Sequence, residues 1–127
     1  FYIDEFYLLT QTASSATFLQ QVYKRARKWH GIPTGITQNV GDLLASPQGE
    51  AILNNSPFVL MLNQSSIDKM KLANILNISP TQLSYITNSD PGRGLIYTGK
   101  TIVPFIDQFP TNTKLYRVMT TKPNEVA

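Results

Sequence analysis

The chain begins with an apolar segment that ends in two adjacent carboxylates, and this pattern restricts the fold more than any other part of the sequence. The apolar residues 1–3 are followed directly by Asp4 and Glu5. Two carboxylates cannot be buried unless a metal, an opposite charge or hydrogen bonds compensate their charge. A buried apolar strand that ends in two carboxylates must therefore place them where the chain leaves the core. We therefore expect a buried strand over residues 1–3 whose carboxyl end places Asp4 and Glu5 at an edge of a sheet.

Strand-like and helix-like segments alternate along the first half of the chain. Apolar residues recur at three- and four-residue spacing over residues 18–26, which indicates one face of a helix. Residues 32–38 are rich in β-forming types and predict a second strand. The continuous apolar run over residues 58–62 predicts a third strand, buried on both faces in the middle of a parallel sheet. This order is typical of a doubly wound α/β domain.

The second half of the chain differs in character. Residues 95–98 and 101–105 are two β-rich runs joined by Gly99-Lys100, which predicts a two-residue hairpin, and residues 115–120 predict a last strand. The expected fold is therefore α/β, with mostly parallel strands and flanking helices, plus a C-terminal β-hairpin. Helix start signals, which are Ser or Asp residues followed by Pro or by a capping partner, occur at Asp42, Ser46-Pro47, Ser65 and Ser79-Pro80-Thr81-Gln82.

Composition excludes several classes of site. The chain of 127 residues has no cysteine and one histidine, which rules out disulfides, thiolate metal centres and histidine pairs. The longest apolar run, residues 58–62, is too short to span a bilayer. The chain begins inside a strand and without Met, so we expect it to be a piece of a longer protein.

Asp4 and Glu5 match the pattern of a strand that serves nucleoside-triphosphate hydrolysis. In such enzymes one acid belongs to the coordination shell of Mg²⁺ and a second residue prepares the attacking nucleophile. A strand end that simply emerges into solvent explains the same two residues equally well, so the spacing alone leaves both interpretations open.

Thr37 and Gln38 follow the second predicted strand. In a parallel sheet they would lie beside Asp4 and Glu5, at the edge where open α/β sheets bind their ligands. A glutamine at this position can hydrogen-bond a γ-phosphate or hold the attacking water. A polar loop is the alternative for an isolated Thr-Gln pair, and only its position relative to Asp4 and Glu5 favours a site.

A local basic cluster is present on an otherwise nearly neutral chain. Lys24, Arg25, Arg27 and Lys28 contribute four of the formal charges of a chain whose net charge is +3. Three interpretations stay open: a solvated helix face, an arginine finger that reaches the nucleotide of a neighbouring subunit, and a contact with DNA. On a continuous helix Arg25 and Arg27 lie about 200° apart, so they cannot both face one partner.

Residues 94–101 match the phosphate-loop pattern G-x-x-x-x-G-K-[ST] letter for letter. A phosphate loop needs a strand before it and a helix after it, so that backbone N–H groups cradle the phosphates. Here the middle residues are strand-like, and the following segment is β-branched with Pro104 as its fourth residue, which is a poor helix start. We therefore expect a hairpin and reject the phosphate loop.

Taken together, these segments resemble the C-terminal part of the conjugative-transfer ATPases of type IV secretion systems, of the VirB/TraC type. The likeness covers nearly the whole chain and is closest to versions from integrative conjugative elements. It is carried by residues 2–6, the helix with residues 23–28, residues 35–39, the run 58–63, and above all the stretch 82–99.

The resemblance implies a RecA-like motor domain that hydrolyses ATP with Mg²⁺. It implies that Asp4 is the Mg²⁺-associated acid, that Glu5 is the catalytic base, and that Gln38, next to the cofactor-binding Thr37, senses the γ-phosphate. Arg25 or Arg27 would be the arginine finger. Residues 1–63 would form the core strands and residues 64–127 the C-terminal helices and hairpin of one ATPase domain, whose phosphate loop lies upstream, in sequence that this chain does not contain.

The resemblance also implies partners and a location. We expect a ring, a hexamer, in the parent protein, at the cytoplasmic face of the cell membrane and in contact with type IV secretion channel proteins. The isolated chain should be inactive and should self-associate, as a dimer for example, because residues 1–3 would be an exposed apolar edge. A RecA-like DNA translocase or coupling protein, with DNA as a contact, and a non-catalytic docking module built on residues 69–89 stay open as alternatives.

Overall fold

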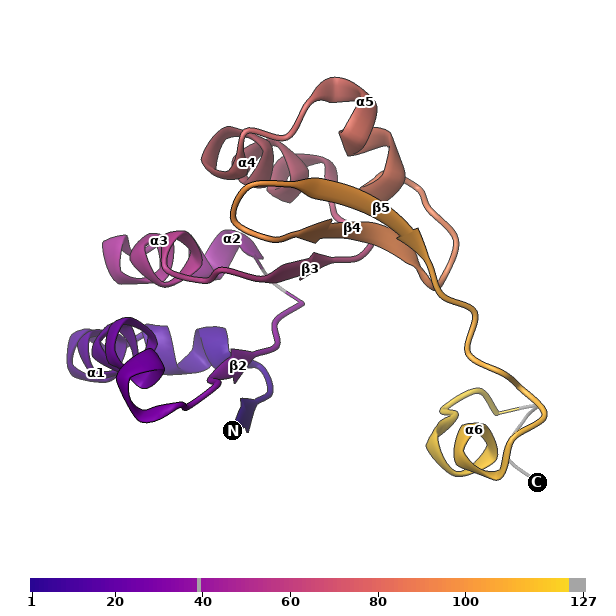
Figure 1. The fold of residues 1–127 in the computed structure, drawn as a ribbon, viewed down its shortest axis with the longest axis horizontal. Coiled ribbons are helices and arrows are strands. Elements are labelled where there is room, and N and C mark those ends of the chain that lie inside the picture. The colour runs from indigo at the N-terminus through magenta and orange to yellow at the C-terminus, as the bar shows by residue number, and fades with distance from the viewer. Residues whose placement is uncertain (39, 124–127) are drawn as a thin grey trace.

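The computed structural model describes residues 1–38 and 40–123, which form helices around two small sheets (Figure 1). The first sheet pairs β1 (Tyr2–Ile3) with β2 (Thr34–Gly35) in parallel, and Ile3 lies opposite Gly35. The second sheet is antiparallel, in the order β3–β4–β5, and consists of β3 (Val59–Met61), β4 (Arg93–Tyr97) and β5 (Ile102–Ile106). The expected α/β class is confirmed, although the parallel pair is the smaller of the two sheets.

Helices make up most of the remaining described chain. Short 3₁₀ helices extend or precede longer α-helices at three places, so the connections between strands are compact. The elements are η1 (Phe6–Thr10), α1 (Ala13–Arg25), η2 (Ala26–Trp29), α2 (Val40–Leu43), α3 (Pro47–Asn54), α4 (Ser66–Leu76), α5 (Pro80–Leu83), η3 (Ser84–Ile86) and α6 (Lys114–Met119).

Serine caps fix the helix starts that the sequence predicted. The Ser46 side chain accepts a hydrogen bond from Gly49 N–H at 3.0 Å, with Pro47 in the first turn of α3. Ser79 and Gln82 form the full capping box at the start of α5. Each cap satisfies a backbone donor that has no partner within its own helix.

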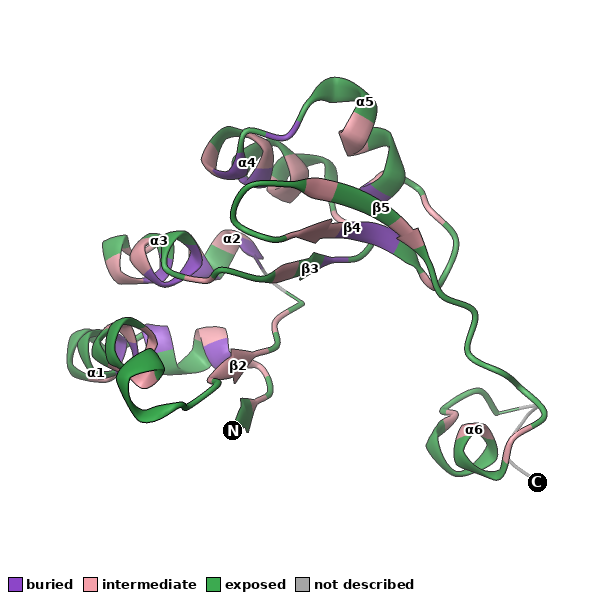
Figure 2. Ribbon diagram, in the orientation of Figure 1, coloured by how far each residue is buried: buried purple, intermediate pink, exposed green. Residues whose placement is uncertain are grey.

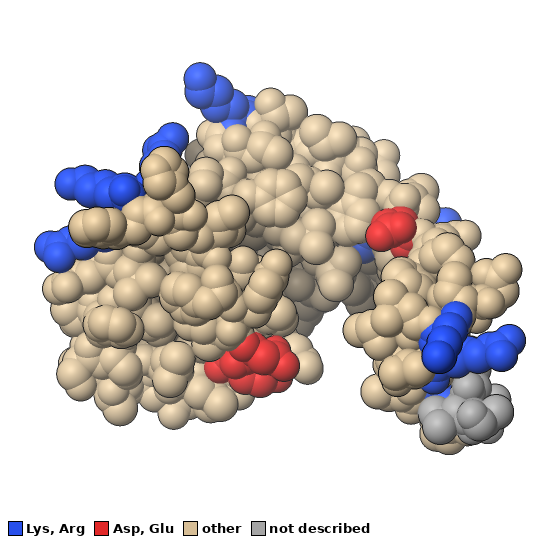
Figure 3. Space-filling model, turned by 60° about the horizontal axis from the view of Figure 1, so that its bottom comes forward, with Lys and Arg blue, Asp and Glu red and all other residues tan. Residues whose placement is uncertain are grey.

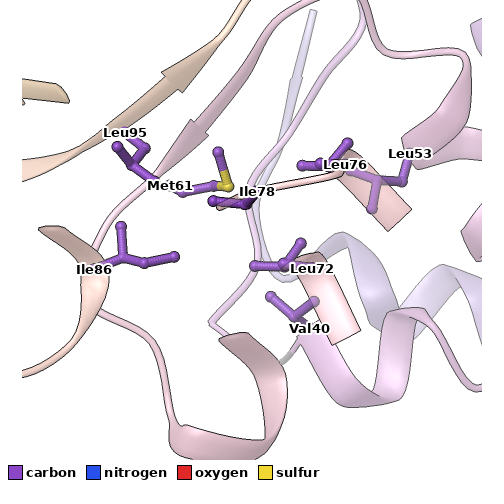
Figure 4. Close-up of a cluster of buried hydrophobic side chains, with 8 residues drawn as sticks. All are labelled: Val40, Leu53, Met61, Leu72, Leu76, Ile78, Ile86 and Leu95. Carbon is purple, nitrogen blue, oxygen red and sulfur yellow. The ribbon is translucent and has the colours of Figure 1, made fainter. Parts of the chain in front are cut away.

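The larger apolar core lies under the antiparallel sheet. Leu95 on β4 and Ile86 on η3 are fully buried, and Met61 on β3 is 3% exposed. Figure 4 shows side chains from two sheet strands and several helices converging there, and Figure 2 shows buried residues on α3, α4 and β4. The members of this core are Val40, Leu53, Met61, Leu72, Leu76, Ile78, Ile86 and Leu95.

A smaller core supports the parallel pair. It consists of Phe6, Leu19, Leu43 and Ile52, and it forms where α1 packs against α3 and η1. Ile3, Tyr7 and Tyr23 pack against it without being fully buried. The parallel pair therefore packs on this smaller core through Ile3 of β1.

The predicted strand over residues 58–62 is present, but its predicted environment is wrong. β3 is antiparallel to β4 and lies at the edge of its sheet, not in the middle of a parallel one. Met61 is buried, whereas Leu60 is 53% exposed. The continuous apolar run over residues 58–62 therefore did not indicate a strand buried on both faces. Within the described chain only one face of β3 is covered.

The predicted strand over residues 115–120 is also wrong, because this segment forms α6. Thr113 caps the helix by accepting a hydrogen bond from Tyr116 N–H at 3.2 Å. Leu115, Val118 and Met119 are exposed, and Figure 1 shows α6 set apart at the end of an extended segment. β-propensity depends on a neighbouring strand, and without one the local cap decides the conformation.

The helix that carries the basic cluster is interrupted. α1 ends at Arg25, and the chain continues as the tighter helix η2 to Trp29, with His30 in the left-handed conformation at φ 52°. The basic cluster therefore does not lie on one continuous α-helix. No helix in the described part of the chain combines the length and apolarity that crossing a membrane requires.

Candidate active site

The two polar strand ends lie side by side. Ile36 N–H donates to Ile3 O at 2.9 Å, and Phe6 N–H donates to Ile36 O at 3.1 Å. The parallel alignment of β1 and β2 therefore continues past the strands themselves, and it brings Asp4-Glu5 and Thr37-Gln38 to the same edge. This is the juxtaposition that the order of strands predicted.

The two carboxylates differ in their surroundings. Asp4 is exposed, and its Oδ1 accepts a hydrogen bond from Glu5 N–H at 2.9 Å. Glu5 is half-buried and has left-handed backbone angles, φ 48° and ψ 39°, at the start of η1. A non-glycine residue in this region costs of the order of 1 kcal/mol, and such residues are concentrated at functional sites.

The second strand end presents Thr37 and Gln38. Thr37 is half-buried and Gln38 is exposed. The residue that follows, Asn39, lies outside the described residues, as do residues 124–127 of the C-terminal tail. The geometry thus brings an acid pair and a polar pair to one edge and leaves Gln38 accessible to a ligand.

Two aromatic rings pack against the chain beside the two strand ends. Phe6, directly after Glu5, stacks on Tyr23 of α1 with ring centroids 6.3 Å apart and planes inclined by 25°. Gly35 of β2 lies against both rings, because a Cβ atom there would be 2.7 Å from Phe6 Cδ1 and from Tyr23 Oη. Burial raises the pKa of Tyr23 above its ordinary value of 10.0, and a backbone hydrogen bond from Gly35 opposes that rise.

The basic cluster is divided between two helices. Arg25 is the last residue of α1 and Arg27 lies in η2, and both are exposed. Neither forms an ion pair with a residue that the structure describes. On the face drawn in Figure 3, basic side chains stand at the periphery, apart from the larger acidic patch.

The phosphate-loop look-alike is a hairpin, as the sequence predicted. Thr98 N–H donates to Thr101 O at 2.9 Å, and Gly99 has φ +78° in the turn between β4 and β5. No helix follows residue 101, because residues 102–106 form β5. This segment has none of the geometry that cradles phosphate.

The described residues offer oxygen ligands but no complete metal site. Residues 1–38 and 40–123 hold no group of three or more His, Asp or Glu side chains that could bind a metal alone. Mg²⁺ in nucleotide sites uses one or two carboxylates together with phosphate oxygens and water, so the Asp4-Glu5 pair fits that ion when a nucleotide is present.

A hollow of about 610 Å³ lies away from this pair, and its lining includes Pro91, Gly92, Phe109 and Tyr116.

Sequence reasoning missed several features of this region. The sequence does not indicate that Trp29, at the end of η2, is 82% exposed. The contact of Tyr23 with Phe6 and Gly35 was also missed, since it joins residues far apart in the chain. The signal that could have found it is the glycine in the middle of a β-rich segment, which often marks a close approach of another element.

Comparison with known proteins identifies relatives of this chain. The model of a family described as the TraG P-loop domain matches residues 1–122. Among solved structures, VirB4 of Thermoanaerobacter pseudethanolicus is similar, with a TM-score of 0.77 and 30% sequence identity. That match covers 86% of this chain and 30% of the VirB4 chain. No curated protein sequence matches the chain.

Proposed function

This chain belongs to the TraG P-loop domain family, a family of type IV secretion and conjugation ATPases, and we propose that it is the C-terminal part of the motor. The motor would hydrolyse ATP to power assembly of, or transfer through, a conjugation channel. The chain spans 30% of the VirB4 chain, so this proposal concerns a longer protein, called here the complete ATPase, that contains this chain together with a phosphate-binding loop.

The observation that carries the proposal is the alignment of two polar strand ends. The hydrogen bond from Phe6 N–H to Ile36 O holds the segment after β1 against the segment after β2. An acid pair and a glutamine at one edge of a parallel pair are the groups that phosphoanhydride hydrolysis needs: a ligand for the metal shell, a base, and a group that orients water.

Glu5 is our candidate for the general base. Its left-handed backbone turns the chain sharply where β1 gives way to η1, and its side chain is half-buried, whereas that of Asp4 is exposed. The different surroundings of two adjacent carboxylates favour different roles. In this assignment Glu5 takes the proton of the attacking water, and Asp4 belongs to the metal shell.

Gln38 and Thr37 complete the edge. The Gln38 amide can both donate and accept hydrogen bonds, so it can hold the attacking water and contact the terminal phosphate. Thr37, the preceding residue, is our candidate for a further contact with the nucleotide. When bound, Mg²⁺ would neutralise charge on the phosphate oxygens, and Asp4 is the residue of this chain that would belong to its shell.

Arg25 and Arg27 are our candidates for an arginine finger that acts on a neighbouring subunit. Both are exposed and without an ion-pair partner among the described residues, and the change from α1 to η2 separates them. This exposure leaves both side chains available to a neighbouring subunit. We propose that the complete ATPase forms a hexameric ring at the cytoplasmic face of the membrane, beside channel proteins. The isolated chain should not hydrolyse ATP, because its only phosphate-loop pattern is a hairpin.

The test is the substitution Glu5→Gln in the complete ATPase. We expect ATP binding to be retained and turnover to fall by about 10²- to 10⁴-fold, the usual contribution of a positioned general base. Binding is followed with a fluorescent ATP analogue and turnover by phosphate release. The matched control is Glu50→Gln, which removes an exposed carboxylate on α3 and should change neither quantity. Unchanged hydrolysis in Glu5→Gln would remove Glu5 from this role.

A further inference from the structure

We propose that Tyr23 is a positioning residue for ATP hydrolysis, which fixes the ends of β1 and β2 to the helix that carries the basic cluster. This inference rests on the proposed function of Glu5 and Gln38. Tyr23 itself touches no reacting group in this account. It acts through Phe6 and Gly35, each of which lies close in sequence to a candidate catalytic side chain.

The first contact joins Tyr23 to the acid pair. Phe6 immediately follows Glu5, and its ring stacks on the Tyr23 ring with centroids 6.3 Å apart. Phe6 is 4% exposed and belongs to the smaller apolar core. The Tyr23 ring is therefore one of the groups that fix the position of the chain just after Glu5.

The second contact joins Tyr23 to the Thr37-Gln38 end. In β2 the N–H groups of Thr34 and Ile36 donate to β1, at 2.9 Å each, so the N–H of Gly35 between them points away from β1. A Cβ atom at Gly35 would lie 2.7 Å from Tyr23 Oη, so the Tyr23 hydroxyl lies directly against the backbone of Gly35. Burial raises the pKa of Tyr23, and a backbone hydrogen bond from Gly35 opposes that rise. Tyr23 thus holds β2 three residues before Gln38.

The third link is covalent. Arg25 lies two residues after Tyr23, at the end of α1. A shift of Tyr23 would therefore move Glu5, Gln38 and the start of the basic cluster relative to one another.

Hydrogen exchange on the isolated chain tests the contact without any assumption about activity. In Tyr23→Phe the ring stack is kept and the hydroxyl is lost, so the Gly35 amide should exchange at least severalfold faster, while amides in β4 keep their rates. Tyr85→Phe, which alters a 42% exposed tyrosine on η3, should leave Gly35 unchanged. An unchanged Gly35 rate in Tyr23→Phe would overturn the proposed tether.

A double-mutant cycle in the complete ATPase tests the positioning role. Tyr23→Phe should lower kcat about three- to tenfold, because the activation free energy should rise by about the net value of one hydrogen bond. KM for ATP should stay unchanged. In a Gln38→Ala background the same substitution should have no further effect on kcat, because the group it positions is gone. If Tyr23 were needed only for folding, Tyr23→Phe would lower kcat by the same factor in the wild-type and the Gln38→Ala backgrounds. That outcome would overturn the positioning role.

The two experiments separate this inference from the proposed function. If Glu5→Gln keeps full turnover while Gly35 exchange responds to Tyr23→Phe, the contact exists but the assignment of the site is wrong. If Glu5→Gln abolishes turnover while Tyr23→Phe leaves kcat unchanged, the site stands and Tyr23 is not a positioning residue.

Discussion

The two sheets of this molecule differ in how they are built and in what they carry. The antiparallel sheet β3–β4–β5 covers a core of eight buried residues, whereas the parallel pair β1–β2 has two residues in each strand and rests on a core of four. The candidate catalytic residues all follow the strands of the smaller sheet or lie in the helices α1 and η2 between them. In our proposal, the candidate site therefore lies apart from the larger apolar core.

This difference has a physical reason. Within the antiparallel sheet, β4 and β5 are joined by a tight turn at Gly99, so the contacts of this hairpin are local and it closes with little loss of chain entropy. β1 and β2 are separated by the whole of α1 and η2, and their short ladder depends on packing against α1 and α3. A site at the end of such a ladder is sensitive to small changes in that packing.

The largest effect on stability should come from the antiparallel half. Leu95→Ala removes a fully buried side chain from β4 and should lower the free energy of unfolding by about 2–5 kcal/mol. Chemical denaturation of the isolated chain measures this. Val103→Ala alters the exposed face of the same sheet, where the side chain is 48% exposed, and should cost far less. Equal losses in the two variants would contradict the assignment of the core.

A smaller effect is expected in the parallel half, from Gly35→Ala. The added Cβ would lie 2.7 Å from both Phe6 and Tyr23, so one ring must move, at a cost of about 1–3 kcal/mol. Gly31→Ala is the matched control, since the nearest atom to its Cβ would be 3.4 Å away. Hydrolysis by the complete ATPase should fall in Gly35→Ala and be kept in Gly31→Ala. If both variants kept full activity, the packing at Gly35 would not matter to the site.

The smallest effect is on the pH dependence of stability. The pKa of Tyr23 is raised in the folded chain, so this group contributes fully to stability below pH 10.0, its ordinary pKa, and the contribution is lost as the pH rises above that value. Thermal unfolding of the isolated chain between pH 9 and 11 should therefore show a shallower alkaline decline in Tyr23→Phe than in the wild type. Identical declines would mean that Tyr23 titrates alike in the folded and unfolded chain.

Local patterns in the sequence predicted most of the features that depend on local physics. The helix caps at Ser46 and Ser79, the turn at Gly99, and the alignment of the Asp4-Glu5 and Thr37-Gln38 strand ends are present as expected. Each rests on interactions between neighbouring residues or on the direction of parallel strands.

Features that depend on distant contacts could not be predicted in this way. The 115–120 segment forms α6 because no strand lies beside it, and the environment of β3 depends on which elements cover its faces. Tyr23 meets Gly35 only because α1 folds back over the parallel pair. Of these segments only Gly35 carries a local signal, which indicates a close approach but not the residue that approaches.

Hydrogen exchange in the complete ATPase, with and without a non-hydrolysable ATP analogue and Mg²⁺, tests the central claim most directly. If the nucleotide binds at the end of the parallel pair, the amides of Phe6 and Ile36 should become more protected, since they hold the two strand ends together. The hairpin over residues 94–101 should not respond. Protection that appears in residues 94–101 and not at Phe6 and Ile36 would contradict the account.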